Sequence, residues 1–177
     1  KTLGVIGLGA IGRKVAASAK ALGMEIAGYD FLGWYKGETE YDFATLVTGN
    51  VTLTAKWQIK TYEVTFDSKD GSAVAAQTVN HGGTASEPTA PTKTGYEFAG
   101  WYADEALTTA WNFTEGKITA PTTLYAKWNI NGYTVTFNSN GGSTVESATV
   151  NYNTVVTEPS APTRTGYTFA GWFVGET

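Results

Sequence analysis

The feature that most constrains the fold of this chain is an internal repeat with a period of 71 residues. Three segments recur at this offset: Tyr62–Phe66 as Tyr133–Phe137, Gly95–Trp101 as Gly166–Trp172, and Ala55–Trp57 as Ala126–Trp128. Agreement of several segments on one period is typical of proteins built from consecutive copies of one structural unit. The sequence therefore predicts that tandem repeats make up most of the 177 residues.

The period divides the chain into repeats of unequal completeness. Residues 58–128 form one complete repeat, and residues 129–177 form the front half of a third repeat. Residues 31–57 form the back half of a first repeat, fused to a different kind of sequence at residues 1–30. Half-repeats leave strand edges unpaired, and such edges favour pairing with another strand. The sequence thus predicts either completion of the first half-repeat by residues 1–30 or head-to-tail self-association.

Each repeat has the pattern of short β-strands. Two apolar sets alternate with polar residues, as in strands with one buried face: Tyr62, Val64 and Phe66, and Leu124, Ala126 and Trp128. Asp70-Gly71 and Asn140-Gly141 predict positive φ angles in tight turns. Pro88–Pro91 predicts an extended connection, because proline donates no backbone hydrogen bond. Residues 103–113 are predicted to hold one short helical turn.

The recurring aromatic side chains admit two interpretations. Tyr96, Phe98, Trp101 and Trp128 could form a platform for a carbohydrate or a peptide. They recur with the period, however, and rings fixed in this way in a small β-module are typical of its core. Burial of such rings contributes a few kcal/mol each and dominates the stability of a module of this size. The core interpretation is therefore favoured.

Composition excludes several kinds of site. The chain has no cysteine and a single histidine, His81, so we predict no disulfide and no metal ligand. The net charge of -4 provides no basic field, and nucleic acid is excluded as a partner on this ground. No apolar run reaches the roughly 18 residues that a membrane-spanning helix needs. The sequence begins at Lys1 and shows no targeting signal.

The first thirty residues have the pattern of a dinucleotide-binding βαβ unit. An apolar strand at residues 2–6 precedes the motif Gly7-Leu-Gly9-Ala10-Ile11-Gly12, and residues 10–22 have the spacing of a helix with one apolar face. A second apolar strand ends near Asp30, where the carboxylate would accept ribose hydroxyl groups of NAD. The helix N-terminus would offer free N–H groups to a pyrophosphate. The predicted cofactor-binding residues are Gly7, Gly9, Ala10, Ile11, Gly12 and Asp30.

Residues 28–177 resemble the Listeria–Bacteroides repeat, also known as the internalin-type B repeat. The resemblance lies in the order of short motifs: Val-Thr-Phe, Gly-Gly, Pro-Thr-Ala-Pro-Thr, Gly-Tyr-Glu-Phe-Ala-Gly-Trp-Tyr, Trp-Asn-Phe and Leu-Tyr-Ala-Lys-Trp. It implies β-grasp-like modules in tandem on bacterial surface proteins, with a spacer or adhesion role and no catalysis. The fold class expected is α+β and mostly β, with tandem β-grasp-like repeats preceded by a single Rossmann-like βαβ unit.

Residues 1–30 resemble the NAD-binding domain of D-2-hydroxyacid dehydrogenases, especially 3-phosphoglycerate dehydrogenases. That family implies a catalytic histidine–acid pair and an arginine downstream of the glycine motif, and those segments are absent here. His81 and Arg164 lie in repeat turns and connections, so we predict no catalytic residue and no enzyme. One βαβ unit also lacks the second half of a dinucleotide fold, which makes the motif vestigial and a bound cofactor unexpected.

The sequence supports two alternative functions. The first is a non-enzymatic repeat protein of the bacterial surface, acting as spacer, adhesion or protein-interaction module in an extracellular or cell-wall location. The alternative is an NAD-binding protein related to the dehydrogenases, with a cytoplasmic origin for residues 1–30. The two sequence types overlap at Gly28–Asp30, where Gly-Tyr-Asp fits both patterns. A natural or engineered chimera joined inside this strand is a third interpretation.

Overall fold

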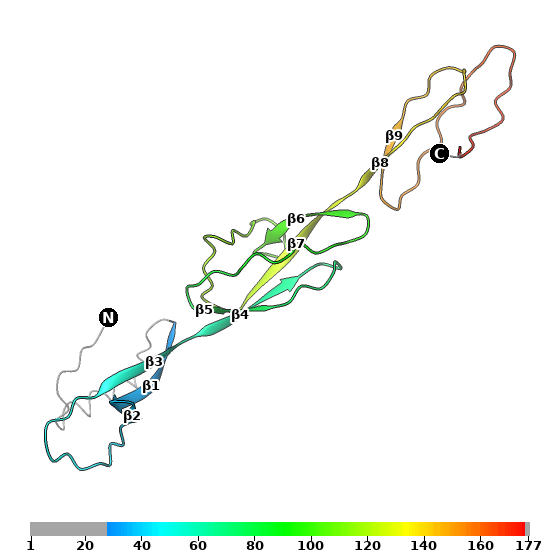
Figure 1. Cartoon of the computed structure of the whole chain (residues 1–177). Helices are drawn as coiled ribbons and strands as arrows, with labels where there is room; N and C mark the ends of the chain where they lie inside the picture. The colour runs from blue at the N-terminus through cyan, green and yellow to red at the C-terminus, as the bar shows by residue number, and fades with distance from the viewer. Residues whose placement is uncertain (1–27, 176–177) are drawn as a thin grey trace. The chain divides into compact units, whose positions relative to one another are not determined.

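The computed structural model of the protein describes residues 28–175, and these residues fold mainly as β-strands (Figure 1). Nine strands and no helix are found in this part of the chain. The prediction of a mostly β protein is therefore confirmed. The predicted βαβ unit, with its strands, glycine motif and helix, lies outside the described residues, and the β-grasp-like architecture stays a prediction.

The nine strands form three sheets. The strands are β1 (Tyr29–Lys36), β2 (Thr39–Glu40), β3 (Thr54–Ile59), β4 (Thr61–Asp67), β5 (Gln77–Asn80), β6 (Tyr96–Tyr102), β7 (Thr122–Ile130), β8 (Gly132–Val135) and β9 (Ala148–Asn151). The N-terminal sheet has the order β2-β1-β3, the central sheet β5-β4-β7-β6, and the C-terminal sheet β8-β9. In the central sheet β7 thus lies between β4 and β6, although β6 precedes it in the chain.

The chain divides into two compact units. The first contains the described residues up to 66 together with 75–87 and 111–124, and the second contains 67–74, 88–110 and the described residues from 125 onward. β4 and β7 contribute residues to both units. The N-terminal sheet belongs to the first unit and the C-terminal sheet to the second.

The N-terminal sheet of the first unit is built on a bulged strand pair. β1 and β3 pair with Phe31 opposite Trp57 and Trp34 opposite Ala55, and the register shifts between Phe31 and Gly33. Gly33 has a φ angle of 146°, a conformation that a side chain at this position of the bulge would disfavour. The glycine of the Gly-Trp pair is therefore required for the bend of the strand.

The pairing of β6 with β7 in the second unit repeats this geometry. Phe98 lies opposite Trp128, Trp101 lies opposite Ala126, and the register again shifts at the residue before Gly100. Gly100 has a φ angle of 117°. The residues that recur in the sequence therefore recur in the same strand pairing.

Apolar side chains from alternating positions form the core of each unit. The buried residues of the first unit are Val64, Phe66, Val79, Ala85, Ile118 and Leu124. In the second unit Trp101 and Ala126 are buried, with exposed fractions of 3% and 1%. Tyr96, Phe98 and Trp128 are half-buried. The alternation predicted for both strands is confirmed, and of the four rings of the core interpretation one, Trp101, is buried and three are half-buried.

The turn after β4 differs from the prediction. The positive φ angles occur at Lys69 and Asp70 instead of Asp70 and Gly71, whereas Asn140 and Gly141 both adopt them as predicted. Gly71 is required for another reason, because a Cβ atom there would lie 2.6 Å from the Trp128 ring. Gly71 therefore provides space for the Trp128 indole. The segment between β4 and β5 is also too long for a tight hairpin turn.

The helical turn predicted in residues 103–113 does not form. The Asp104 carboxylate accepts hydrogen bonds from the Thr108 N–H at 3.0 Å and the Thr109 N–H at 2.8 Å. The Leu107 N–H donates to the Asp104 carbonyl at 3.0 Å, and Leu107 has a positive φ angle of 56°. A side-chain acceptor that binds these backbone donors competes with a helix, and here it closes a loop instead.

Candidate interaction surface

A glycine and an aromatic ring meet where the N-terminal sheet continues into β4. The Gly28 carbonyl accepts a hydrogen bond from the Lys60 N–H at 2.8 Å, and the Lys60 carbonyl accepts one from the His81 N–H at 2.8 Å. The His81 ring lies directly over Gly28, so that a Cβ atom on this glycine would be 2.1 Å from the ring. The Tyr62 ring lies beside the His81 ring, with the ring centroids 5.9 Å apart. We call this arrangement the first joint.

The second unit contains the same arrangement one period later. Gly95 accepts a hydrogen bond from the Asn131 N–H at 2.9 Å, and Asn131 accepts one from the Tyr152 N–H at 2.8 Å. The Tyr152 ring lies over Gly95, where an added Cβ atom would be 1.9 Å from it. We call this the second joint. Gly166, one further period along, has the same φ angle of 80° as Gly95 but nothing within 4 Å of an added Cβ atom.

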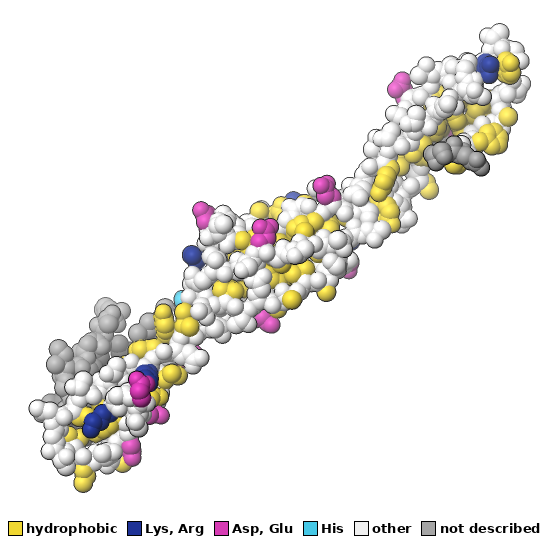
Figure 2. All heavy atoms as spheres, in the orientation of Figure 1, with side chains coloured by type: hydrophobic (Ala, Val, Ile, Leu, Met, Phe, Trp, Pro, Cys, Tyr) yellow, Lys and Arg dark blue, Asp and Glu magenta, His cyan; other side chains and the backbone are white. Residues whose placement is uncertain are grey.

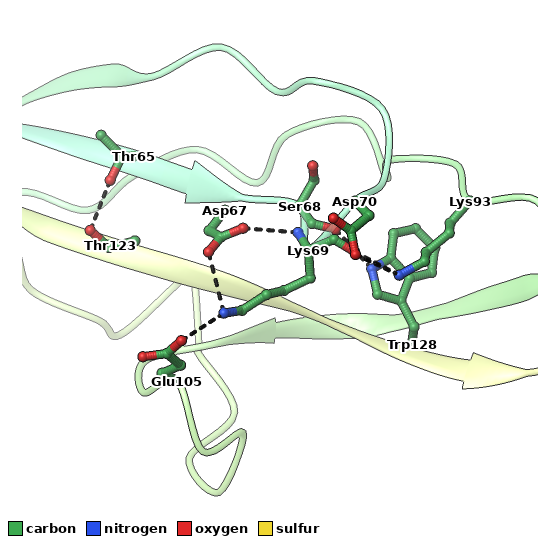
Figure 3. A network of polar contacts seen from close by, with 9 residues as sticks. All are labelled: Thr65, Asp67, Ser68, Lys69, Asp70, Lys93, Glu105, Thr123 and Trp128. Carbon is green, nitrogen blue, oxygen red and sulfur yellow. Dashed lines mark hydrogen bonds and ion pairs between the residues drawn. The ribbon is translucent and has the colours of Figure 1, made fainter.

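A polar network fixes the loop after β4 within the second unit (Figure 3). The Trp128 indole N–H donates to the Ser68 carbonyl at 2.8 Å, and Lys93 Nζ donates to the Lys69 carbonyl at 2.8 Å. Lys69 Nζ lies 3.0 Å from Glu105 and 3.4 Å from Asp67. The hydrogen bond to Glu105, with a further contribution from Asp67, raises the pKa of Lys69 above its ordinary value. Because these charges are exposed, we assign the network to loop positioning and not to acid–base chemistry.

The C-terminal segment, residues 131–175, exposes several large hydrophobic side chains. Tyr133, Val155, Tyr167, Phe173 and Val174 are all exposed, and yellow side chains are visible along this segment in Figure 2. Larger exposed apolar surfaces are typical of interaction sites. The C-terminal segment is therefore a candidate interaction surface, as is the segment 29–57, which exposes six large hydrophobic side chains.

Of the predicted cofactor-binding residues, only Asp30 lies in the described part of the chain. It is on β1, opposite Gln58, and its carboxylate pairs with Lys60 Nζ at 3.5 Å. Gly7, Gly9, Ala10, Ile11 and Gly12 lie outside the described residues, so the cofactor site stays a prediction. The carboxylate of Asp30 is mostly exposed and accessible from solvent.

The two residues considered for catalysis have structural contacts in this fold. His81 forms the first joint, and the Arg164 guanidinium donates to the Asn140 carbonyl at 2.9 Å while stacking on the Tyr167 ring. Within residues 28–175, no group of three or more potential metal ligands comes together. In the same residues, no helix has the length and apolar character needed to cross a membrane.

Sequence reasoning did not assign the joints. Their signal was present in the sequence, because Gly28 and Gly95 begin the Gly-Tyr segments and His81 and Tyr152 occupy equivalent positions of the period. The contact between them joins residues that are more than 50 positions apart in the chain. Only the three-dimensional structure identifies which ring covers which glycine.

These repeated strand pairs and joints define a tandem-repeat β protein. A model of the Listeria-Bacteroides repeat domain matches residues 62–127 and 133–177, which is more than half of the chain. The chain belongs to the Listeria–Bacteroides repeat family. A second model, the NAD-binding domain of D-isomer specific 2-hydroxyacid dehydrogenases, matches residues 1–53. Both resemblances inferred from the sequence are thereby confirmed.

Three curated proteins are similar in sequence to this chain. A protein of Evansella cellulosilytica named "Putative membrane protein" is 44% identical over 156 residues, covering 86% of this chain and 24% of the relative. Another from the same organism, named "Putative Gly-rich membrane protein", is 43% identical over 161 residues, covering 89% and 19%. Internalin H of Listeria monocytogenes is 44% identical over 117 residues, covering 66% and 21%. The chain thus spans at most about a quarter of these relatives, and no solved structure matches it.

Proposed function

We propose that this chain is a non-enzymatic repeat module of a bacterial surface protein, where it acts as a spacer and a protein-interaction module. The observation that supports this most is the recurrence of one strand pairing and one joint along the chain. A spacer needs units that connect in the same way each time, and the two joints provide such a connection. Catalysis is assigned to no residue, and an extracellular or cell-wall location is proposed from the family and from the similarity to internalin H.

Antibody labelling of intact cells tests the location. Antibodies raised against the full chain are applied to intact and to permeabilised cells of a bacterium that carries the sequence. Labelling of intact cells is expected, because a surface module is accessible from outside. Labelling that requires permeabilisation would contradict the surface role.

Single-molecule stretching tests the spacer role. Held by its ends, the full chain is expected to unfold in discrete steps, because each repeat forms its own hydrogen-bonded sheet. Extension of one 71-residue period releases a contour length of roughly 230 Å. A featureless extension without steps would show that the repeats bear no load.

A second candidate function is binding of NAD by residues 1–53. The match of these residues to the dehydrogenase NAD-binding domain supports it. In this alternative the chain is an NAD-binding protein, and the junction at Gly28–Asp30 marks a chimera of two origins. Calorimetric titration of the full chain with NAD distinguishes the two. The surface proposal predicts no saturable heat, whereas micromolar affinity that is lost in Gly9→Val would establish the alternative.

A further inference from the structure

Two Asn-Gly pairs occur in this chain, Asn131-Gly132 and Asn140-Gly141. In such a pair the backbone nitrogen of the glycine can attack the side-chain amide of the asparagine and release ammonia, without an enzyme. The glycine favours this reaction because it has no side chain to shield its nitrogen. How fast the reaction runs depends on how firmly the fold holds the two residues, and the structure holds the two pairs very differently.

Asn140-Gly141 forms the tip of the turn that follows β8. Both residues have positive φ angles, 47° and 83°. The Gly142 N–H donates to the Ser139 carbonyl at 3.0 Å, and the Ser139 hydroxyl donates to the Gly142 carbonyl at 3.0 Å, so the turn is closed on either side of the pair. Within residues 28–175, the hydrogen bonds of Asn140 involve its backbone N–H and carbonyl only. Its side-chain amide is therefore free to turn towards the Gly141 nitrogen.

This turn lies at the surface of the repeat. Asn140 and Gly141 are both exposed. The equivalent residues of the complete repeat are Lys69 and Asp70, which also have positive φ angles, and the Asp70 side chain is 93% exposed. The turn thus stays accessible in the repeat whose sheet contains β4, β5, β6 and β7. Water and hydroxide, which the reaction consumes, reach Asn140-Gly141 from solvent.

A cation lies against the peptide bond between Asn140 and Gly141. Arg164 Nη1 donates to the Asn140 carbonyl at 2.9 Å, and the guanidinium carbon lies 3.5 Å from the place of a Cβ atom on Gly141. When the Gly141 nitrogen loses its proton, the negative charge spreads onto this carbonyl oxygen, because the peptide group is conjugated. A guanidinium that is already bonded to the oxygen stabilises that charge. Arg164 therefore favours the step that makes the nitrogen a nucleophile.

The other pair is held in extended backbone at the second joint. The Asn131 N–H donates to the Gly95 carbonyl at 2.9 Å, and the Asn131 carbonyl accepts from the Tyr152 N–H at 2.8 Å. Gly132 is the first residue of β8 and pairs with Asn151 of β9. Closing a ring between the Asn131 side chain and the Gly132 nitrogen would rotate this backbone and cost its hydrogen bonds. The Asn131 carbonyl also accepts from a neutral N–H, whereas a guanidinium donates to that of Asn140.

We propose that Asn140 is a site of spontaneous covalent modification, where Asn140-Gly141 converts to an aspartate or isoaspartate linkage and Arg164 promotes the reaction. Hydroxide removes the proton of the Gly141 nitrogen, and this nitrogen forms a bond to Cγ of Asn140. The bond from Cγ to Nδ2 breaks, and Nδ2 takes up a proton from water and leaves as ammonia. Water then opens the cyclic imide. Cleavage between the nitrogen and Cγ gives aspartate, and cleavage between the nitrogen and the main-chain carbonyl carbon gives isoaspartate.

The two products have different consequences for the turn. Either one places a carboxylate near Arg164. In the complete repeat the Asp70 carboxylate lies 3.5 Å from Lys93 Nζ, the counterpart of Arg164, so the turn accommodates an aspartate beside its cation. Isoaspartate lengthens the backbone by one carbon between Ser139 and Gly142 and is expected to break the hydrogen bonds that close the turn. The modification goes beyond the proposed surface role and does not depend on it.

Peptide mapping of the full chain tests the site. The chain is kept in mildly alkaline buffer, and mass spectrometry follows the conversion of each asparagine with time, after chromatographic separation of aspartate and isoaspartate. Asn140 is expected to convert at least about ten-fold faster than Asn131. In concentrated urea the two rates should become similar, because the fold that distinguishes the pairs is lost. Equal rates in the folded chain, or an unchanged Asn140, would overturn the proposal.

Variants of Arg164 test the promoting cation. Arg164→Gln removes the charge and is expected to slow the conversion of Asn140 by about three- to ten-fold, while Asn131 keeps its rate. Arg164→Lys should retain most of the rate, because Lys93 Nζ makes the equivalent bond to the Lys69 carbonyl at 2.8 Å. An unchanged or faster conversion of Asn140 in Arg164→Gln would overturn the role of Arg164. Faster conversion of Asn131 in a variant would reveal lost folding, and the unmodified chain with and without urea then decides the site.

Discussion

At the residue scale, the joints depend on glycines for two separable reasons. Gly95 and Gly166 share a φ angle of 80°, but only Gly95 lies under an aromatic ring. The left-handed conformation favours glycine at both positions, while the close contact with Tyr152 requires it at one. This difference allows backbone strain and steric overlap to be measured independently in one chain.

Substitution of these two glycines should therefore have unequal effects. Gly166→Ala is expected to lower the free energy of unfolding by about 1 kcal/mol, because alanine is strained at this φ angle. Gly95→Ala adds an overlap with the Tyr152 ring and is expected to cost about 1–3 kcal/mol more. Urea denaturation of the two variants measures the difference. Equal losses would show that the Tyr152 contact is not part of the joint in solution.

The carboxylate of Asp104 is the residue that organises the loop after β6. Hydrogen bonds from the Thr108 N–H first, and from the Thr109 N–H and the hydroxyl groups, hold the pKa of Asp104 below its ordinary value. A depressed folded-state pKa means that the loop gains stability above the unfolded-state pKa. That contribution is lost as the pH falls through the folded-state pKa.

Thr108→Val removes the hydroxyl donor and leaves the backbone N–H in place. The pKa of Asp104 is therefore expected to rise towards its ordinary value without reaching it. Titration of the carboxyl carbon by nuclear magnetic resonance measures the change. Thr114→Val, in a different turn, is the matched control and should leave the Asp104 midpoint unchanged.

At the element scale, equivalent positions of the repeat differ in burial. Leu124 on β7 is 0% exposed, whereas Leu53, one period earlier, is half-buried. The sequence is nearly the same around both leucines, and the main difference lies in what surrounds each strand. β7 has a neighbour on both sides and β3 has one among the described residues.

Truncation of the two leucines should follow this difference. Leu124→Ala is expected to destabilise the protein by about 2–5 kcal/mol, the usual cost of a fully buried leucine. Leu53→Ala removes less buried apolar area and is expected to cost about 1 kcal/mol. Thermal unfolding of each variant measures the loss. A Leu53→Ala variant as unstable as Leu124→Ala would mean that β3 is covered as fully as β7 in solution.

At this scale the strand pattern and the positive φ angles of Asn140-Gly141 were predictable from the sequence, whereas the conformations at Gly71 and Asp104 were not. Val64, Phe66, Leu124 and Ala126 alternate in sequence, and alternation fixes which face of a strand is buried. The turn at Gly71 depends on Trp128, far along the chain, and the loop at Asp104 depends on the side-chain acceptor that Asp104 offers to Thr108 and Thr109. A side-chain acceptor and an indole from β7 decided those conformations.

At the scale of the whole molecule, the three sheets are expected to differ in stability. The central sheet contains all strands of a complete repeat and its core residues are buried, whereas β8 and β9 pair only with each other among the described residues. Isolated two-stranded pairs are marginally stable in water. Repeat proteins unfold according to the stability of each unit and its neighbours.

Hydrogen exchange of the full chain should therefore proceed in a defined order. Backbone amides of β4 and β7 are expected to exchange most slowly, and those of β8 and β9 faster. Mass spectrometry of peptic fragments measures the order at low protein concentration. Uniform exchange over all three sheets would indicate one cooperative unit.

The sequence by itself determined the repeat period, the strand faces, the family and the absence of cysteine chemistry, because these follow from residue identity and spacing. The tertiary structure decided which ring covers each joint glycine and which strand lies between β4 and β6. Those features depend on contacts between residues far apart in the chain. Segments of nearly identical sequence therefore have different neighbours in the fold. Residues 52–59 and 123–130 are nearly the same in sequence, yet only the second set lies between two strands among the described residues.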